Sequence, residues 1–224
     1  MAIYIEKVDV LNDKAARKRF IDIQFDTYKD DSNWVPQLRM ELNKLFKASH
    51  PFYKTAQCAF YIAIKDGKDV GRIAAINNNH YNKFHNSKEG HWGFFEAIDD
   101  KEVFKTLFNA ATEWCKSLGM NKFVGPFNPS TNYECGTLIK GHGERPVLMM
   151  IYNSEYYQNY IEELGFSKAM DILAYHMETK QDLPEVITKI AARAETKQAI
   201  SYRTVSKKNW QEEIKLMYEI YNDA

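Results

Sequence analysis

Apolar side chains alternate along several early stretches of the chain, and this spacing is typical of β-strands. Residues 3–10 alternate and are rich in β-branched types, so we expect a strand there. Residues 58–78 contain two apolar runs on either side of Asp66-Gly67, which predicts a two-stranded hairpin with a tight turn. A third long strand is expected at residues 90–98, which read GHWGFFEAI.

A longer helix is predicted directly after this strand. Apolar side chains recur every three or four residues over 103–118, the spacing of one helix face. Asp99 and Asp100 open the helix, and Asp99 with Glu102 resembles a capping box. Gly119 stands where a helix usually ends in a left-handed residue.

Shorter elements complete the pattern. One helix is capped by Asn12 or Asp13, and another begins after Ser154 and ends at Gly165. The shorter helices are expected at residues 14–28, 37–46 and 155–164, and further strands at residues 122–127, 147–152 and 171–177. This mixture predicts an α/β (mixed α+β) domain.

The chain divides into three parts by pattern. Residues 1–180 are expected to form one domain, and residues 181–199 a polar helical linker. Residues 200–224 repeat the opening order of strand then helix. Aligned with residues 3–27 without gaps, they share six identities: Ile3/Ile200, Val8/Val205, Asn12/Asn209, Lys18/Lys215, Ile23/Ile220 and Asp26/Asp223. We therefore expect a second copy of the fold to begin near Ile200 and to be cut off at Ala224.

Charge and composition narrow the classes of function. Lys+Arg and Asp+Glu both number 30, and this balance argues against a nucleic-acid or membrane-surface binder, which would need a basic excess. The three cysteines form no close pair, so we expect reduced thiols. Neither a signal peptide nor an apolar run of ~20 residues is present, which predicts a cytoplasmic protein.

Two charged residues lie inside predicted strands. Alternation would place Glu96 on one face with Trp92, Phe94 and Ile98. A carboxylate among apolar neighbours has a raised pKa and is suited to act as a general base toward an amine. Arg72 would clamp a carboxylate or phosphate of a substrate, or it would simply pair with Glu96.

The segment GPFNPSTNYECG, residues 125–136, carries many short polar groups just past a strand end, where open α/β sheets place ligands. The candidate substrate-binding residues are Asn128, Ser130, Asn132, Tyr133 and Glu134. The alternative is a turn built by Asn and Pro. His80, His85 and His91 match no ligand spacing, so no metal is expected.

The order of elements resembles the GNAT superfamily of N-acetyltransferases. The long strand GHWGFFEAI runs straight into a helix, and NYIEELGFSKAMDILAYHM looks like the helix, Gly-Phe turn and final strand of that family, with Gly165-Phe166 as the Gly-Phe pair. The resemblance covers residues 3 to about 178. It implies a GNAT-like fold, with a central, mostly antiparallel twisted sheet and helices on both faces.

Five short segments resemble a narrower group of longer bacterial proteins that carry a second GNAT-like half. They are WVPQL, GRIAAI, GFFEAID, GPFNPSTNYECG and YNSEYY. The resemblance implies that these residues are the N-terminal half of such a protein.

Two features depart from the GNAT pattern. The family places R/Q-x-x-G-x-G/A before the long helix, where backbone N–H groups meet the pyrophosphate of coenzyme A. Here AIDDKEVFKTL has no glycine, and its acidic groups would cost at least ~1–2 kcal/mol beside a pyrophosphate. The family's acidic Tyr, four residues before the Gly of Gly-Phe, is replaced by Ile161, which leaves the adjacent Tyr160 as the candidate acid.

The resemblance implies acyl transfer from acetyl-CoA or another acyl-CoA to an amine on a small-molecule acceptor. Glu96 would be the base, and this half would have a degenerate coenzyme A site. The alternative is a non-catalytic GNAT-like module for recognition or scaffolding. Truncation of the second unit would leave apolar residues near Ile214, Met217 and Ile220 exposed. We expect them to pack on a second molecule in a homodimer or on the missing C-terminal half.

Overall fold

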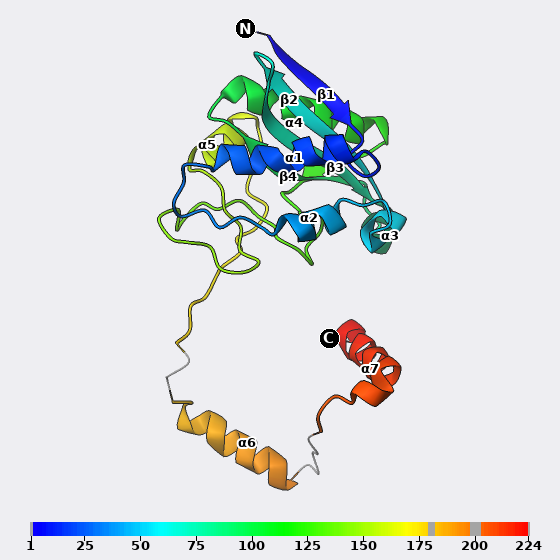
Figure 1. Ribbon diagram of the computed structural model, residues 1–224. Coiled ribbons are helices and arrows are strands. Elements are labelled where there is room, and N and C mark those ends of the chain that lie inside the picture. The colour runs from blue at the N-terminus through cyan, green and yellow to red at the C-terminus, as the bar shows by residue number, and fades with distance from the viewer. Residues whose placement is uncertain (1, 179–181, 198–202, 224) are drawn as a thin grey trace. The chain divides into compact units, whose positions relative to one another are not determined.

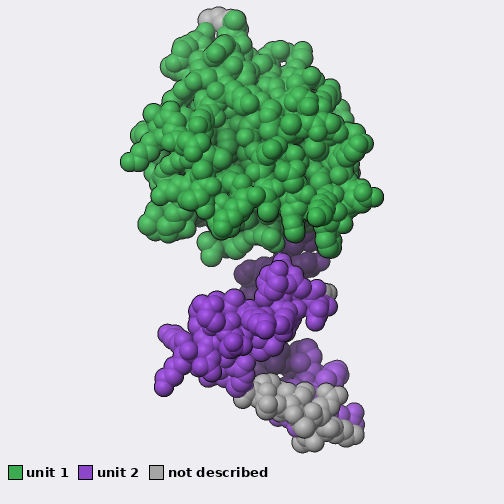
Figure 2. All heavy atoms as spheres, turned by 90° about the vertical axis from the view of Figure 1, so that its right-hand side faces the viewer, with its two compact units in different colours: residues 1–172 green, residues 173–224 purple. Residues whose placement is uncertain are grey.

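The computed structural model describes residues 2–178, 182–197 and 203–223. The chain divides into two compact units, residues 1–172 and residues 173–224, which are coloured separately in Figure 2. The first unit contains the sheet and both hydrophobic cores. None of the helices among the described residues has the length and apolar character needed to cross a membrane.

Five strands form the sheet of the first unit, in the order β1-β2-β3-β4-β5. Figure 1 labels the first four of them. Neighbouring strands are antiparallel except β4 and β5, which are parallel. The strands are β1 Ile3–Val8, β2 Ala56–Lys65, β3 Lys68–Asn78, β4 Glu89–Ala97 and β5 Lys122–Val124. The mixed α/β class and the mostly antiparallel sheet are therefore confirmed.

Helices cover both faces of this sheet (Figure 1). Helices α1 (Lys14–Thr27) and α2 (Arg39–Leu45) pack on one face, where Phe20 and Phe46 are fully buried against β2 and β3. Helices α4 (Lys101–Ser117) and α5 (Tyr156–Glu163) pack on the other. The short helices η1 (Pro51–Lys54) and α3 (Asn79–Phe84) flank β2 and β4. Each fully buried large apolar side chain contributes about 1.5–3 kcal/mol to stability.

The local signals of the sequence act as expected at most element ends. Asp66 and Gly67 have φ of 52° and 74°, the left-handed pair that a tight hairpin requires. Asp13 caps α1 by accepting a hydrogen bond from the Ala15 amide. Gly119 follows α4 with φ of 79°. The cap of α4 differs from the expectation, since it is Asp100 rather than Asp99 that accepts from the Glu102 amide.

Strand β4 contains a bulge that changes the direction of its side chains. Its register against β3 pairs Arg72 with Glu96 but Ala74 with Gly93, so β4 has one extra residue. Phe94 has φ of 48°, a conformation that is uncommon outside glycine. The expectation that Trp92 and Phe94 share a face is therefore wrong, because Trp92 joins the core under α4 and Phe94 joins the core under α1.

Two predicted strands are wrong. Residues 147–152 and 171–177 have no regular secondary structure, and Leu148 and Tyr175 are 93% and 86% exposed. Both runs have the apolar composition of a buried strand, but among the described residues no neighbouring strand pairs with them. An unpaired strand leaves its backbone groups unsatisfied, so composition alone does not produce one.

The second unit consists of α6 (Glu185–Lys197), η2 (Lys207–Asn209) and α7 (Trp210–Asp223). The helix expected near the chain end is present as α7. Of the strand expected before it, residues 200–202 lie outside the described residues, and residues 203–205 are not in a strand. Arg203 pairs with Glu213 in this region. The domain boundaries and the second copy of the fold stay predictions.

The close approach of residue Phe127 to β4 depends on a glycine. A Cβ placed on Gly93 would lie 1.6 Å from the Phe127 carbonyl oxygen, a distance that only a backbone shift would relieve. We predict that Gly93→Ala lowers the free energy of unfolding by about 3 kcal/mol or more. The matched control is Gly143→Ala, where the added Cβ meets no atom within 4 Å. Urea denaturation tests both variants, and equal midpoints would contradict this role for Gly93.

Candidate functional site

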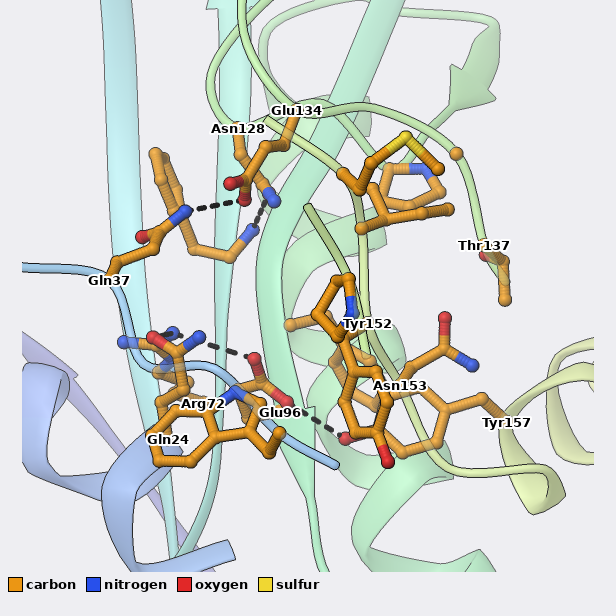
Figure 3. Close-up of a pocket in the computed structure, with 18 of the residues that line it drawn as sticks. Gln24, Gln37, Arg72, Glu96, Asn128, Glu134, Thr137, Tyr152, Asn153 and Tyr157 are labelled. Atoms are coloured by element: carbon orange, nitrogen blue, oxygen red, sulfur yellow. Dashed lines mark hydrogen bonds and ion pairs between the residues drawn. The ribbon is translucent and has the colours of Figure 1, made fainter. Parts of the chain in front are cut away.

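A cavity lies where the β4 bulge meets the ends of α1 and α5 and the long loops that follow β5 (Figure 3). Its volume is about 70 Å³, enough for a few water molecules or a small polar group. Its walls combine apolar side chains with carboxylates, carboxamides and one guanidinium. This combination is typical of a site for a small polar ligand.

All five segments that resemble the longer bacterial proteins contribute to this cavity. Trp34 and Gln37 come from WVPQL, and Arg72 comes from GRIAAI. The other contributors are Phe94, Phe95 and Glu96 from GFFEAID, Pro126, Asn128, Glu134 and Gly136 from GPFNPSTNYECG, and Tyr152, Asn153 and Tyr157 from YNSEYY. Segments spread over more than a hundred residues of sequence thus meet at one place, which marks the cavity as the candidate functional site.

Glu96 lies at the base of the cavity and is 7% exposed. Its Oε2 accepts hydrogen bonds from the hydroxyls of Tyr28 at 2.7 Å and Tyr157 at 3.1 Å. Its Oε1 lies 3.7 Å from Nη2 of Arg72 (Figure 3). The bulge in β4 turns Glu96 toward α1 and β3, so the carboxylate meets these groups rather than the core under α4.

Burial governs the protonation of this cluster. Loss of water around Glu96 raises the pKa of its carboxyl, and Arg72 and the two tyrosines only partly oppose that shift. Burial also lowers the pKa of Arg72 and raises the pKa of Tyr28 and Tyr157. The two tyrosines therefore remain protonated donors, and Glu96 is the group placed to gain and lose a proton.

Arg72 is held by more than its partner carboxylate. It is 2% exposed, and its Nη1 donates to the Phe20 carbonyl at 2.7 Å, while Nη2 donates to Gln24 Oε1 at 3.1 Å. Helix α1 thus fixes the guanidinium against β3. Both alternatives drawn from the sequence remain, because Arg72 pairs with Glu96 and also lines the cavity.

An aromatic wall surrounds Tyr28. Its ring lies 5.4 Å from the ring of Trp34 and 5.6 Å from that of Tyr152. Tyr152 in turn donates to Asp31 at 2.5 Å, which ties the loop before α5 to the end of α1. These contacts fix the hydroxyl of Tyr28 on Glu96.

The loop after β5 supplies the opposite wall. Asn128 accepts a hydrogen bond from the Phe94 amide at 2.6 Å, so it holds the bulge in place. Glu134 accepts from the Gln37 side chain at 2.5 Å, which joins this loop to the segment before α2 (Figure 3). Burial raises the pKa of the Glu134 carboxyl. Asn128 and Glu134 therefore both line the cavity, and their role in substrate binding stays a prediction.

The structure separates the other candidates from this site. Ser130, Asn132 and Tyr133 belong to the same loop but do not line the cavity. Ser130 accepts from the Asn132 amide at 3.3 Å, the local turn contact that the sequence offered as the alternative. Tyr160 lies outside as well, and its hydroxyl donates to Asp99 at 2.6 Å.

The start of α4 is filled by its own side chains. Asp100 accepts from the Glu102 amide at 2.9 Å and from the Lys65 ammonium group at 2.5 Å. Asp99 accepts a hydrogen bond from the hydroxyl of Tyr160. These carboxylates occupy the positive end of the helix dipole. The residues present do not fit the glycine-rich cradle by which GNAT enzymes usually hold a pyrophosphate.

Several site residues were missed by reasoning from sequence. Gln37, Tyr152 and Asn153 line the cavity, and Tyr28 and Tyr157 hold Glu96. Tyr28 ends α1 and is 68 positions away from Glu96, so no local pattern connects the two. The one available signal was that Gln37, Tyr152, Asn153 and Tyr157 belong to the segments resembling the longer bacterial proteins. Within the described parts of the chain, no cluster of His, Cys, Asp or Glu is suited to hold a metal ion.

Replacement of Arg72 tests how much the buried Arg72–Glu96 ion pair contributes to stability. We predict that Arg72→Met lowers the free energy of unfolding by about 3 kcal/mol near pH 7.5, because Glu96 loses its cation. Without Arg72, the folded-state pKa of Glu96 rises further above its unfolded value. The folded variant then binds a proton over a wider range, so its stability falls more steeply than that of the wild type as pH rises.

Urea denaturation at several pH values between 5 and 8 measures this effect. The expected difference between wild type and Arg72→Met is smallest at the acidic end, where Glu96 is protonated in the folded variant. A difference that stays constant across the range would contradict the coupling of the two groups.

Comparison with known proteins gives relatives over nearly the whole chain. The chain is 34% identical over 208 residues to Protein YghO of Escherichia coli K12, covering 92% of this chain and 53% of that protein. It is also 34% identical over 212 residues to a bacterial ceramide synthase of Caulobacter vibrioides, covering 94% of this chain and 55% of that protein. The chain thus spans about half the length of the curated relatives it matches. No family model matches it.

Solved structures give weaker likenesses. The aminoglycoside acetyltransferase AAC(6')-Iy, in complex with a bisubstrate analogue, is 13% identical with a TM-score of 0.49, over 80% of this chain and 99% of that one. A tandem GNAT protein from the clavulanic acid biosynthesis pathway is 9% identical with a TM-score of 0.48, over 73% of this chain and 43% of that one. Likenesses with TM-scores below 0.5 carry no argument. The chain's own element order and strand pairing resemble the GNAT fold over residues 3–166, without the final strand expected at residues 171–177.

Proposed function

We propose that this protein takes part in acyl transfer from an acyl thioester, such as acetyl-CoA or another acyl-CoA, to the amine of a small-molecule acceptor. The observation that carries the proposal is the buried carboxylate of Glu96, held at the base of a polar cavity by Arg72, Tyr28 and Tyr157. A carboxylate with a raised pKa in such a place is suited to general-base chemistry.

In the proposed reaction, Glu96 accepts a proton from the acceptor ammonium and frees the nitrogen lone pair. The nitrogen then attacks the thioester carbonyl, so that an N–C bond forms and the C–S bond breaks. As the C–S bond breaks, the nitrogen releases its second proton to solvent, and the leaving thiolate takes up one proton, which its donor regains from solvent. Tyr160 is the candidate donor of that proton; its hydroxyl lies outside the cavity and donates to Asp99.

The chemical class of the acyl acceptor is proposed from the name of one curated relative. One of the two curated proteins is named a ceramide synthase, and a ceramide is an N-acylated long-chain amino alcohol. We therefore propose a primary amine of that class as acceptor. Apolar side chains of the cavity wall, including Val35, Met150 and Ile151, would contact its hydrocarbon part.

A second function has one specific observation in its favour. The start of α4 already holds Asp100 with Lys65, and Asp99 with Tyr160, so it offers no free amide cradle for a pyrophosphate. In this alternative, the unit is a non-catalytic recognition or scaffold module that acts with the remaining part of a longer protein.

Replacing the proposed base tests the first function. Glu96→Gln keeps an oxygen that accepts hydrogen bonds from Tyr28 and Tyr157 but cannot take up a proton. We predict that kcat for acylation of sphinganine by an acyl-CoA falls by about 10²–10³-fold. Release of the free thiol of coenzyme A measures the rate. The matched control is Glu113→Gln on the exposed face of α4, which is expected to retain wild-type activity.

Equal activity of the Glu96 and Glu113 variants would remove Glu96 from the mechanism. The same assay tests Tyr160→Phe, which is expected to lower kcat about tenfold or more if its hydroxyl protonates the thiolate. A wild-type rate in that variant would remove Tyr160 from the proposal.

Thermal unfolding with acetyl-CoA distinguishes the two functions. The acyltransferase proposal predicts that a ligand at 100 times its dissociation constant adds ~2.7 kcal/mol to the free energy of unfolding, and that the melting temperature rises by several degrees. The absence of any shift up to millimolar acetyl-CoA would favour the non-catalytic module.

A further inference from the structure

The cavity contains two carboxylates but only one cationic side chain among the described residues that line it. Glu96 and Glu134 both line the cavity, and the charge of Glu134 contributes to the raised pKa of Glu96. The one cation is Arg72, which lies 3.7 Å from Glu96. With both carboxylates ionised, the cavity wall carries a net negative charge.

Glu134 is the carboxylate without a cation. Its partner is the neutral carboxamide of Gln37, at 2.5 Å. Among the described residues, no Lys, Arg or His nitrogen lies within 4.0 Å of it. Glu134 is half-buried, and a carboxylate that has lost part of its water is costly unless it is paired, so a site built in this way favours a ligand that brings its own positive charge.

The cavity wall also carries N–H donors that lack a partner. Arg72 and Trp92 are each 2% exposed, and both line the cavity. Nε of Arg72 and Nε1 of Trp92 have no hydrogen-bond acceptor among the described residues. Buried N–H groups normally find an acceptor, and a ligand oxygen is one that would satisfy such a donor.

We propose that the cavity binds a small primary amino alcohol in its ammonium form, with the ammonium group on Glu134 and a hydroxyl oxygen facing Nε of Arg72. This assignment rests on the acyl-transfer function proposed above and names the part of the acceptor that the site recognises. Glu134 is then the residue that selects a cationic amine over a neutral polyol. Glu96, at the base of the same cavity, receives the proton before acylation.

A purely structural role for Glu134 makes a different prediction. Its contact with Gln37 joins residues 34–38 to residues 125–136, and that connection alone would explain a carboxylate here. Glu134→Gln separates the two roles. The glutamine oxygen still accepts from Gln37, but the negative charge is gone.

Two matched probes test the proposal. Serinol (2-amino-1,3-propanediol) and glycerol have the same heavy-atom skeleton, and only the first carries an ammonium group at neutral pH. Binding of each to the whole chain is measured by ligand-observed NMR titration. The wild type is expected to bind serinol at least tenfold more tightly than glycerol. Glu134→Gln is expected to weaken serinol binding by roughly tenfold to a hundredfold and to leave glycerol unchanged.

Two further variants make the result decisive. Glu134→Asp keeps the charge and is expected to keep the preference for serinol, while Glu113→Gln, which removes an exposed charge on α4, is expected to bind as wild type. Equal affinity of the wild type for serinol and glycerol, or equal serinol affinity of wild type and Glu134→Gln, would overturn the proposal.

Acylation kinetics show which of the two proposals has failed. If Glu96→Gln loses activity while Glu134→Gln keeps the wild-type KM for the amine, the acyl-transfer function stands and the role of Glu134 is wrong. If serinol binds with the expected dependence on Glu134 but the wild type acylates no amine, the binding site stands and the acyl-transfer function is wrong.

Discussion

The buried charge of Glu96 is the constraint around which this molecule is arranged. A carboxylate taken out of water must be paired and hydrogen-bonded. Arg72 from β3, Tyr28 from the end of α1 and Tyr157 from α5 supply those partners. Elements from both faces of the sheet therefore contact the carboxylate of Glu96, and the cavity lies where these elements meet.

The bulge in β4 makes this convergence geometrically feasible. Gly93 allows the Phe127 carbonyl to approach β4 closely, and Asn128 binds the Phe94 amide. Past this point the strand presents Glu96 to Arg72 and α1. The same loop then brings Glu134 back over the cavity to Gln37. The bulge thus sets the direction of Glu96, and the loop that binds the bulge through Asn128 carries Glu134. The chemical proposals depend on the positions of these two carboxylates.

Much of this fold could be predicted from local sequence patterns, but the candidate site could be predicted only in part. The hairpin at Asp66-Gly67 and helix α4 were predictable because turn chemistry and helix periodicity are local. Glu96 and Arg72 were identified because charges stand out within apolar strands. The bulge could not be foreseen, since residues 92–96 read as a regular alternation. The strand predicted at residues 147–152 was wrong for the opposite reason. The composition of these residues suits a strand, but no described strand lies beside them. Tyr28 lies far from Glu96 in sequence, and only tertiary packing joins them.

The most direct test of this account is a titration of the Glu96 carboxyl itself. Its ¹³C resonance, assigned by its disappearance in Glu96→Gln, is followed by NMR over the pH range in which the protein stays folded. The account predicts a midpoint above 4.5, the ordinary value for a glutamate, and a further rise when Arg72 is replaced by Met. A midpoint at or below 4.5 would show that Glu96 is a stably paired structural anion, and it would contradict its proposed role as the base.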